Sequence, residues 1–519
     1  MTKKTKGFLF LLPLLLVIPL VLTWNSVFAP PIKRAQNYNV VLLTIDTTRA
    51  DFIGAYGNRS VSTPNIDSLA RDGVLFEHFY STINTTLAAH ASIFTGLYPR
   101  NHGVGRNSMR LNQKNLTIAE FLHANGYDTA AFIGSFALAS VFGVKQGFET
   151  FDESFIGDMS DYVSRNASFA NKDNKEFQIV LTKQKVGDIE RRAGDVNKSF
   201  FGWLDQNKNK KFFAFVHYYD PHFPYNPPEE WYRRRLSAIP AGVPLSTPDR
   251  PAFEKLFENM TPALAKFQAS NFNNFPLPNS MDALLKLYAS EIEYADSAVG
   301  QIIKKLNETG LRNKTIFIVT ADHGENLVDH PEFKTFFRHG FLTHDTETHI
   351  PFIVSCPGYL PSGERVNEVA SEVDIFPTVA DLLGFRPPRV DGISVLKEFF
   401  GQKIHTNRDI FAEASQPHLD FHKFAAQMVW VNDRNSAFAR KGDYKYITAP
   451  WINYEAVFNL QEDPGERNNL LGSVSKGDLR KFRKDLKEWR SKAALGNIDS
   501  SFQLSDEERD KLKSLGYVQ

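Results

Sequence analysis

Cysteine is almost absent from this chain of 519 residues, and several other features are missing with it. Cys356 is the only cysteine, which excludes an intrachain disulfide framework and a cysteine-based zinc site. Since no cysteine follows the apolar N-terminal run, a lipoprotein anchor is excluded as well. The net charge is only +1 and the two signs are interspersed, so there is no electrostatic case for binding nucleic acid. No internal repeat and no low-complexity tract is evident.

The N-terminus has the layout of a secretory signal or a signal anchor. Three lysines precede an uncharged apolar run from residue 7 to residue 24, and this run approaches the length that spans a bilayer. A cleavage-like stretch at residues 27–29 is followed directly by Pro30, so we prefer a retained anchor to a cleaved peptide. We therefore expect the folded part to lie outside the cytoplasm, either anchored to the membrane by this segment or secreted, for instance into a periplasm.

Apolar runs of strand length alternate with helical segments from about residue 39 to residue 385. Strands are expected at residues 39–45, 128–133, 212–217, 315–320 and 351–355. This alternation predicts an α/β fold with a doubly wound, mostly parallel sheet. Shorter runs and a charged helix follow from about residue 401, which indicates a smaller C-terminal α+β subdomain. The expected units are an anchor and linker at 1–37, an α/β domain at 38–400 and the subdomain at 401–519.

A short helix is predicted from Thr86 to Gly96. Threonine is a favoured N-cap, the following residues are mostly good helix formers, and Gly96 is a natural stop. Helix N-termini bind anions, so the hydroxyl of Thr86 would lie where a bound phosphate or sulfate is attacked. His90 lies about one turn further along the same face. Taken alone, an ordinary capped helix also explains this stretch.

Chemically useful side chains follow several of the predicted strands. Asp46 and the pair Asp322–His323 come directly after buried strands, and His222 lies in the loop after another. Ligands of open α/β sheets bind outside the carboxyl ends of the strands. Two carboxylates, an imidazole and a hydroxyl gathered there suit one divalent cation: calcium, magnesium, manganese or zinc. Such a cation beside Thr86 would lower the pKa of its hydroxyl and neutralise an anionic ester.

The motifs together resemble the sulfatase family of the alkaline phosphatase superfamily. The matching segments are residues 46–51, 86–99, 220–225 and 322–325, and His339-Gly340 ahead of Ile350-Pro351. Phe458-Asn459-Leu460 and Leu515-Gly516-Tyr517 resemble the C-terminal subdomain of that family. The resemblance covers roughly residues 38–519.

The resemblance implies a role for each matching residue. By its pattern, one cation would be held by Asp46, Thr86, Asp322 and His323, and the catalytic positions would be Thr86 (nucleophile), His222 (ester oxygen or leaving group), His339 (substrate oxyanion) and His90. In sulfatases the place of His90 is usually held by arginine, and many have a second metal-binding aspartate where this chain has Thr47. One cation is expected rather than two, because the additional His-and-carboxylate set for a second cation is not evident.

The largest departure from the family pattern is Thr86 itself. Sulfatases have a cysteine or serine there that is oxidised to formylglycine, and threonine offers no known route to that aldehyde. Threonine beside a metal is instead the arrangement of phospho-transferring relatives. The resemblance thus implies a metal-dependent, sulfatase-like hydrolase that cleaves a sulfate or phosphate (di)ester through Thr86, on an anionic glycan, lipid or small molecule. Alternatives are an envelope phosphotransferase of the phosphoglycerol or phosphoethanolamine type, and a catalytically silent protein that binds anionic glycans.

Overall fold

The structure is a computed structural model. It describes residues 32–155, 190–223, 225–238, 281–333, 335, 337–403, 408–416, 434–492, 499 and 501–514. The predicted N-terminal anchor and the predicted terminal motif at 515–517 lie outside the described residues. Across the described part of the chain, no helix combines the length and the apolar character that crossing a membrane requires.

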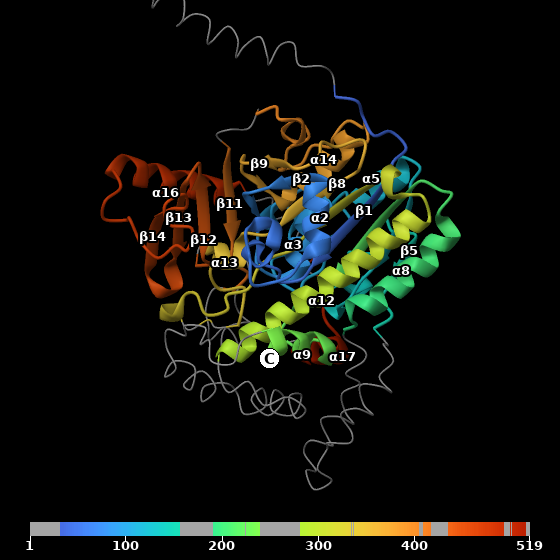
Figure 1. The fold of residues 1–519 in the computed structure, drawn as a ribbon. Coiled ribbons are helices and arrows are strands. Elements are labelled where there is room, and N and C mark those ends of the chain that lie inside the picture. The colour runs from blue at the N-terminus through green and yellow to red at the C-terminus, as the bar shows by residue number, and fades with distance from the viewer. Residues whose placement is uncertain are drawn as a thin grey trace, which may run out of the picture.

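An eight-stranded sheet runs through the larger part of the molecule (Figure 1). Its order across the sheet is β5 (Thr150–Asp152), β4 (Asp128–Phe132), β6 (Phe212–Tyr218), β1 (Asn39–Ile45), β7 (Thr315–Thr320), β8 (Phe352–Ser355), β2 (Gly73–Phe76) and β9 (Glu364–Val366). The pairs from β5 through to β7 are parallel, whereas β8 runs antiparallel to both β7 and β2. The mostly parallel α/β sheet predicted from the sequence is therefore confirmed.

Helices cover both faces of this sheet, because the central strands are apolar on both sides. In β1, Val41 and Leu43 belong to one buried cluster, whereas Val40 and Leu42 belong to the other. The first face is covered by α2 (Pro64–Arg71), α8 (Ala193–Asn207) and the long helix α12 (Met281–Glu308). The second is covered by α3 (Thr86–Thr95), α5 (Ile118–Ala124) and α14 (Ile375–Leu382). Period-2 side-chain alternation in fully buried strands produces this two-sided core.

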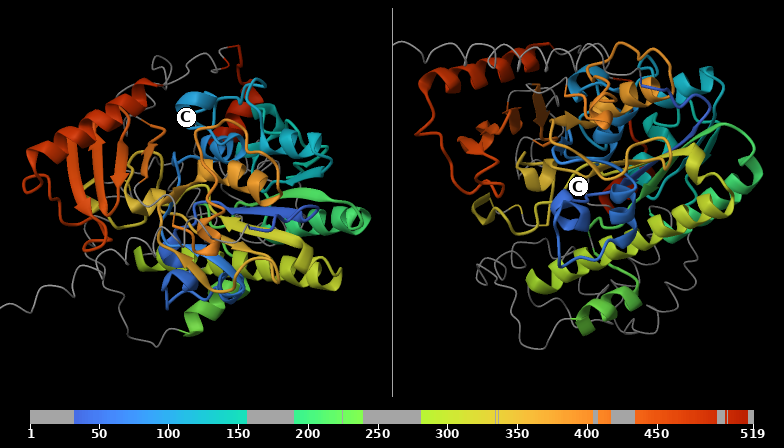
Figure 2. Two further views of the ribbon diagram at one scale, coloured as in Figure 1. Left: turned by 90° about the horizontal axis from the view of Figure 1, so that it is seen from above. Right: turned by 45° about the horizontal axis from the view of Figure 1, so that its top comes forward.

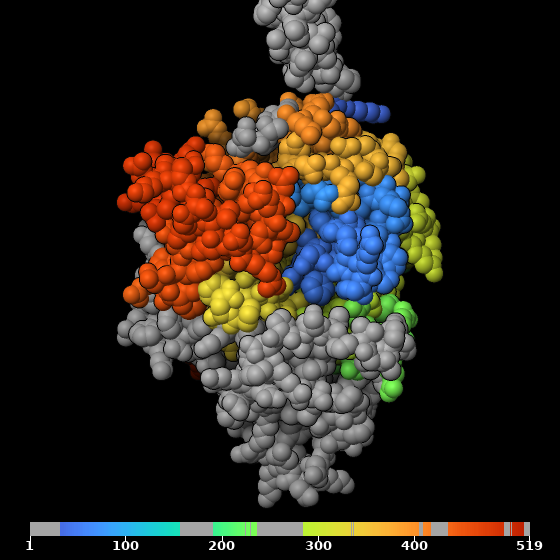
Figure 3. All heavy atoms as spheres, turned by 60° about the vertical axis from the view of Figure 1, so that its left-hand side comes forward, coloured from blue at the N-terminus to red at the C-terminus, as the bar shows by residue number. Residues whose placement is uncertain are grey.

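A smaller sheet lies beside the main one and is entirely antiparallel (Figure 2). It consists of β11 (Asp409–Glu413), β12 (Ala437–Lys441), β13 (Tyr444–Ala449) and β14 (Tyr454–Asn459), with α16 (Lys476–Ser491) packed on one face. In the space-filling view this unit forms a lobe next to the blue N-terminal segment (Figure 3). The last described helix, α17 (Asp506–Ser514), returns to the main unit, where Leu512 joins the larger core. The predicted domain limits stay a prediction.

Short elements complete the described structure. They are the two-stranded pair β3 (Phe79–Tyr80) and β10 (Ala370–Ser371), and the helices α4 (Pro99–His102), α9 (Glu229–Ala238) and α13 (Asp345–Thr348). Between residues 227 and 280, only the segment at 227–238 is described. Cys356 is fully buried, as expected of a small apolar residue.

Candidate metal and nucleophile site

The three central strands deliver the predicted ligands to one edge of the sheet. β1 pairs in parallel with β6 on one side and with β7 on the other, so the three carboxyl ends lie together. Asp46 follows β1 directly, and Asp322 and His323 follow β7 after one intervening residue. The side chains of all three are fully buried. Residues from two ends of the domain therefore meet because their strands are neighbours.

The ligand atoms of Asp46, Asp322 and His323 all lie within 4.8 Å of one another. Asp46 Oδ1, Asp322 Oδ2 and His323 Nε2 are buried and have no hydrogen-bond partner among the described residues. Buried polar atoms are normally paired, so three such atoms facing one point call for a common partner. His323 donates Nδ1–H to the carbonyl of Gly324 at 2.8 Å, which leaves the Nε2 lone pair for that partner. The residues present thus fit a divalent cation.

The pKa shifts of the two carboxyl groups also favour a bound cation. Burial, followed by the charge of Asp322, raises the pKa of Asp46 well above its ordinary value. Although burial opposes it, the neighbouring histidines and the backbone N–H of His323 lower the pKa of Asp322. Two buried carboxylates therefore cannot both stay ionised at low cost unless positive charge lies between them.

Thr86 lies beside this cluster, as predicted. It is the first residue of α3, and Gly96 ends that helix with φ = 66°, a left-handed conformation that suits glycine. The Thr86 hydroxyl donates to Asp46 Oδ2 at 3.5 Å. The Thr86 hydroxyl therefore lies against the Asp46 oxygen that also faces His217 Nε2, next to the unpartnered Oδ1 of the same carboxylate.

Thr47 orients the cluster but directs its hydroxyl away from it. Its backbone N–H donates to Asp322 Oδ1 at 3.2 Å, and its hydroxyl donates to the carbonyl of Pro221 at 3.0 Å. Thr47 has φ = 49°, which is unusual for a β-branched residue. Tyr288 of α12 stabilises this turn, because its hydroxyl donates to the carbonyl of Thr47 at 2.8 Å and accepts the N–H of Arg49 at 3.2 Å.

His90 packs against the nucleophile position with both ring nitrogens engaged. Its Nδ1–H donates to the carbonyl of Thr86 at 2.7 Å, so its Nε2 accepts the hydroxyl of Thr44 at 2.9 Å. Burial lowers the pKa of His90 to about 3, and the ring is neutral. Its Nδ1 lies 3.8 Å from Asp322 Oδ2. His90 therefore presents an N–H dipole, and not a full charge, to the site.

His222 and His339 lie together on the remaining side of the cluster. The ring centre of His339 is 4.3 Å from that of His323 and 5.2 Å from that of His222. His222 donates Nδ1–H to the carbonyl of Phe223 at 2.6 Å, and burial lowers its pKa well below the ordinary value. His339 lies 3.2 Å through Nδ1 from the buried carboxylate of Glu325. The structure thus brings together all seven residues predicted for the site.

The sequence reasoning missed His217, which was assigned only to a buried strand. His217 Nδ1 accepts the backbone N–H of Gly134 at 3.2 Å, so the neutral ring carries its proton on Nε2. Burial lowers the pKa of His217 to about 4, which keeps the ring neutral, and Nε2 lies 3.4 Å from Asp46 Oδ2. The available signal was a histidine inside an apolar run, one position before the strand ends. Its partner in register is Thr44 of β1.

A second missed pair, Asn84 and Glu347, connects the nucleophile segment to the loop of His339. Asn84 Nδ2 donates to Glu347 Oε2 at 2.5 Å and also to the carbonyl of Leu342. Glu347 additionally accepts the N–H of Gly340 at 2.9 Å. Burial, and then the charge of Glu325, raise the pKa of Glu347 well above its ordinary value. This buried carboxyl group fixes the segment ahead of Thr86 relative to the loop of His339.

Comparison with protein families gives two overlapping matches. A family model described as Sulfatase matches residues 38–385. A second model, described as N-sulphoglucosamine sulphohydrolase, C-terminal, matches residues 332–492. Between them these models span the main sheet, the site and the smaller sheet with α16.

Individual relatives cover nearly the whole chain. The chain is 26% identical over 504 residues to the multifunctional alkaline phosphatase superfamily protein PehA of Trinickia caryophylli, covering 87% of this chain and 95% of the relative. It is also 26% identical over 466 residues to an arylsulfatase of Clostridium perfringens, covering 84% and 90%. The solved structure of a phosphonate monoester hydrolase from Silicibacter pomeroyi matches with a TM-score of 0.67 at 23% identity, covering 91% and 98%. That structural likeness shows the shared fold.

Proposed function

Since the chain belongs to the sulfatase family, we propose that it is a metal-dependent ester hydrolase that cleaves a sulfate or phosphate (di)ester through Thr86. One observation carries the proposal: the Thr86 hydroxyl lies 3.5 Å from Asp46 Oδ2, beside three buried ligand atoms without partners among the described residues. An abandoned site would have no reason to keep this arrangement. A silent glycan-binding protein is therefore the weaker alternative.

Asp46, Asp322 and His323 would hold the cation, with Thr86 Oγ1 as a further ligand. A divalent cation there supplies positive charge that lowers the pKa of the Thr86 hydroxyl and neutralises an anionic ester. Calcium, magnesium and manganese suit this mixed oxygen and nitrogen set, and zinc is the fourth candidate. The proton of Thr86 is directed at Asp46 Oδ2, and the N-terminus of α3 adds a favourable dipole.

His222 and His339 would contact the substrate. Thr86 Oγ1 attacks the phosphorus or sulfur atom, the bond to the leaving alcohol breaks, and water later releases the bound group. His222 in its neutral form has its proton on Nδ1, so it becomes a donor at Nε2 only when an anionic substrate raises its pKa. His339, oriented by Glu325, would contact the ester oxygens on which charge builds up.

We assign His90 a positioning role within this scheme. Because its ring bonds to the carbonyl of Thr86 and to Thr44, it fixes the first turn of α3 against β1. Its predicted catalytic contribution would then be the N–H dipole near Asp322.

Threonine at the nucleophile position favours phosphate chemistry over sulfate chemistry. A threonine ester of phosphate can be attacked by water, whereas the formylglycine route needs a cysteine or serine precursor. The relatives named above comprise an arylsulfatase, a phosphonate monoester hydrolase and a protein described as multifunctional, so sulfate-ester and phosphonate-ester hydrolases both occur among similar chains. The N-terminal apolar run supports an extracytoplasmic location, with a membrane anchor or secretion as the two routes.

The test uses the purified chain with added divalent cation and four substrates: an aryl sulfate, an aryl phosphate, a phosphodiester and a phosphonate monoester. Thr86→Ala is expected to lower kcat/KM by about a thousandfold or more, whereas Thr86→Ser keeps activity within about tenfold. Brief exposure to the preferred substrate should add one transferred group to the peptide containing residue 86. Undiminished turnover in Thr86→Ala would refute the mechanism. Turnover of none of the four classes would favour the glycan-binding alternative.

A further inference from the structure

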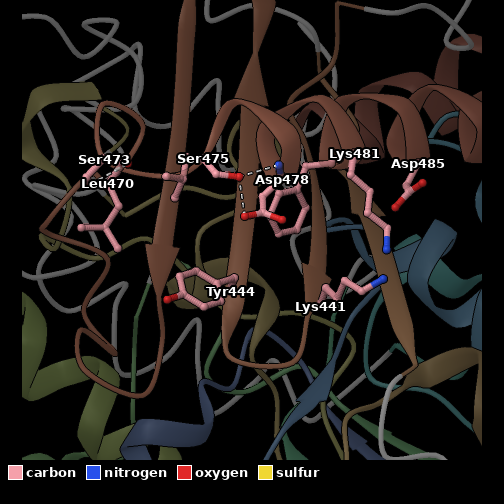
Figure 4. Close-up of a pocket in the computed structure, with 10 residues that line it drawn as sticks. Lys441, Tyr444, Leu470, Ser473, Ser475, Asp478, Lys481 and Asp485 are labelled. Carbon is pink, nitrogen blue, oxygen red and sulfur yellow. Dashed lines mark hydrogen bonds between the residues drawn. The ribbon is translucent and has the colours of Figure 1, made fainter.

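A pocket of about 480 Å³ opens on the smaller sheet, between the β12–β13 hairpin and the start of α16 (Figure 4). Leu470, Val474 and Phe482 supply its apolar lining. Tyr444 at the hairpin adds an aromatic ring that is 43% exposed. An exposed aromatic ring over an apolar lining is suited to the CH-rich face of a ring-shaped polar ligand.

This pocket lies on the opposite face of the small sheet from the catalytic site. Tyr446 of β13 packs with Phe482 of α16, whereas its neighbour Lys445 reaches Asp345 in the main unit at 2.6 Å. Tyr444 has the same parity as Tyr446, so both belong to the α16 face. A ligand in the pocket would therefore not touch Asp46, Asp322 or His323.

The polar rim is fixed in place before any ligand arrives. Ser475 caps α16, because its hydroxyl accepts the N–H of Asp478 at 3.0 Å and donates to the Asp478 carboxylate at 2.7 Å (Figure 4). Hydroxyl and carboxylate oxygens at this rim match the hydrogen-bonding groups of a sugar.

One end of the pocket carries two lysines. The amino groups of Lys441 and Lys481 end close together in the close-up view (Figure 4). Asp409 Oδ2 lies 3.4 Å from Lys441 Nζ, and the carboxylates of Asp409 and Asp485 balance the formal charge of the two ammonium groups locally. The helix behind them is nevertheless basic, with seven lysines or arginines against three acidic residues. Two adjacent ammonium groups in a positive field are stabilised by an oxyanion placed between them.

We propose that this pocket binds one unit of an anionic polysaccharide, with the sugar ring against Tyr444 and its sulfate or carboxylate group between Lys441 and Lys481. The proposal goes beyond the hydrolase function, since it assigns a second contact with a polymer remote from the catalytic site. A polymer held there would keep its other units near the molecule, which raises their effective concentration at the catalytic site.

The test measures calorimetric binding of a size-defined sulfated oligosaccharide, and of its desulfated counterpart, to the full chain. Tyr444→Ala is expected to weaken binding of the sulfated ligand about tenfold, which corresponds to about 1.4 kcal/mol. Lys481→Gln should weaken it about three- to fivefold at low salt and less at high salt. Lys484→Gln is the matched control, because it removes the same charge from the same helix at a residue outside the pocket lining.

Three further readouts separate this pocket from the catalytic site. Thr86→Ala should leave the pocket affinity unchanged, and turnover of a small aryl ester should be unchanged in Tyr444→Ala, which also reports correct folding. Equal affinity for the desulfated ligand, no saturable binding, or equal affinity in Tyr444→Ala and the Lys484→Gln control would each overturn the proposal. None of these results bears on the role of Thr86.

Discussion

Replacing Asp46 by asparagine should separate the electrostatic cost of the site from its affinity for metal. The Asp46 and Asp322 ligand atoms lie within 4.8 Å, and both side chains are fully buried. At an effective dielectric constant of about 20, two ionised carboxylates at that distance repel by about 3.5 kcal/mol. Because burial and the charge of Asp322 raise the pKa of Asp46, the metal-free protein can lower this cost by taking up a proton as the pH falls.

The structure also indicates that asparagine fits without a cation. Its amide oxygen can accept from Thr86 and face His217, while its NH₂ group faces the lone pair of His323 Nε2, which lies 4.0 Å from Asp46 Oδ1. In EDTA, Asp46→Asn should therefore unfold at a temperature up to about 3 °C higher than the wild type. This conversion uses an unfolding entropy of about 2.1 cal/mol/K per residue over the chain.

Added cation should reverse the order of the two proteins. At one hundred times its dissociation constant, a bound ion stabilises the wild type by about 2.7 kcal/mol, or about 2–3 °C, whereas Asp46→Asn should gain nothing. Calorimetric scans at pH 8 with EDTA, calcium, magnesium, manganese or zinc measure both effects. The control is Asp205→Asn, which loses only an exposed ion pair with Lys305 and should keep the full cation response.

The pH dependence of stability provides an independent test of the Asp46 assignment. Because the pKa of Asp46 is raised in the folded state, the metal-free wild type binds more protons folded than unfolded, and this contribution to stability grows as the pH falls. The advantage of Asp46→Asn in EDTA should therefore shrink between pH 8 and pH 5. A widening gap, or a cation response that survives in the variant, would refute the assignment of Asp46 as a ligand.

Three further predictions concern buried polar groups outside the ligand set. Tyr288→Phe removes both hydrogen bonds that hold the turn of Thr47 and should cost about 1–3 kcal/mol in urea unfolding, together with weaker cation binding. Burial lowers the pKa of His102 to about 3, so the free energy of unfolding of the wild type should fall as the pH drops below about 6.5. His102→Gln should reduce this pH dependence by up to about 1.4 kcal/mol per pH unit, as measured by urea titrations at pH 7.5 and pH 5. Arg100→Met breaks a buried ion pair in which Arg100 donates three hydrogen bonds to Glu413 of β11, and it should cost about 3–5 kcal/mol. Adding Glu413→Leu should restore most of this loss.

The sequence was most informative where an apolar run ends in a charged residue. β1 and β7 were predicted at their observed positions because each is a mostly apolar run of strand length, and in the structure every residue of both strands is buried. The carboxyl ends of neighbouring parallel strands share one edge, so Asp46 and Asp322 could be brought together before any coordinates existed. The helix from Thr86 to its stop at Gly96 was equally clear from its first and last residues.

Other features were not predictable from the sequence, because the strand is too short to show a pattern or because the feature depends on a distant segment that packs against it. β2, β5 and β9 have only three or four residues, too few to show a period. The antiparallel direction of β8 depends on its pairing with β7, which local sequence does not encode. His217 and Glu347 became visible as site residues only through atoms contributed by distant segments, namely Asp46 in one case and Asn84 in the other.

Thr47 shows how one substitution shapes the chemistry that the cluster can support. Where many sulfatases have a second metal-binding aspartate, this chain has a hydroxyl that bonds to Pro221 and an N–H that orients Asp322. Under the proposed assignment, the described residues offer three buried ligand atoms and the Thr86 oxygen, fewer than the six or more that calcium or magnesium takes. Oxygens of water or of the substrate would then fill the remaining positions, so cation affinity should rise when an anionic ester binds. By linkage, ester affinity should rise by the same factor when the cation binds.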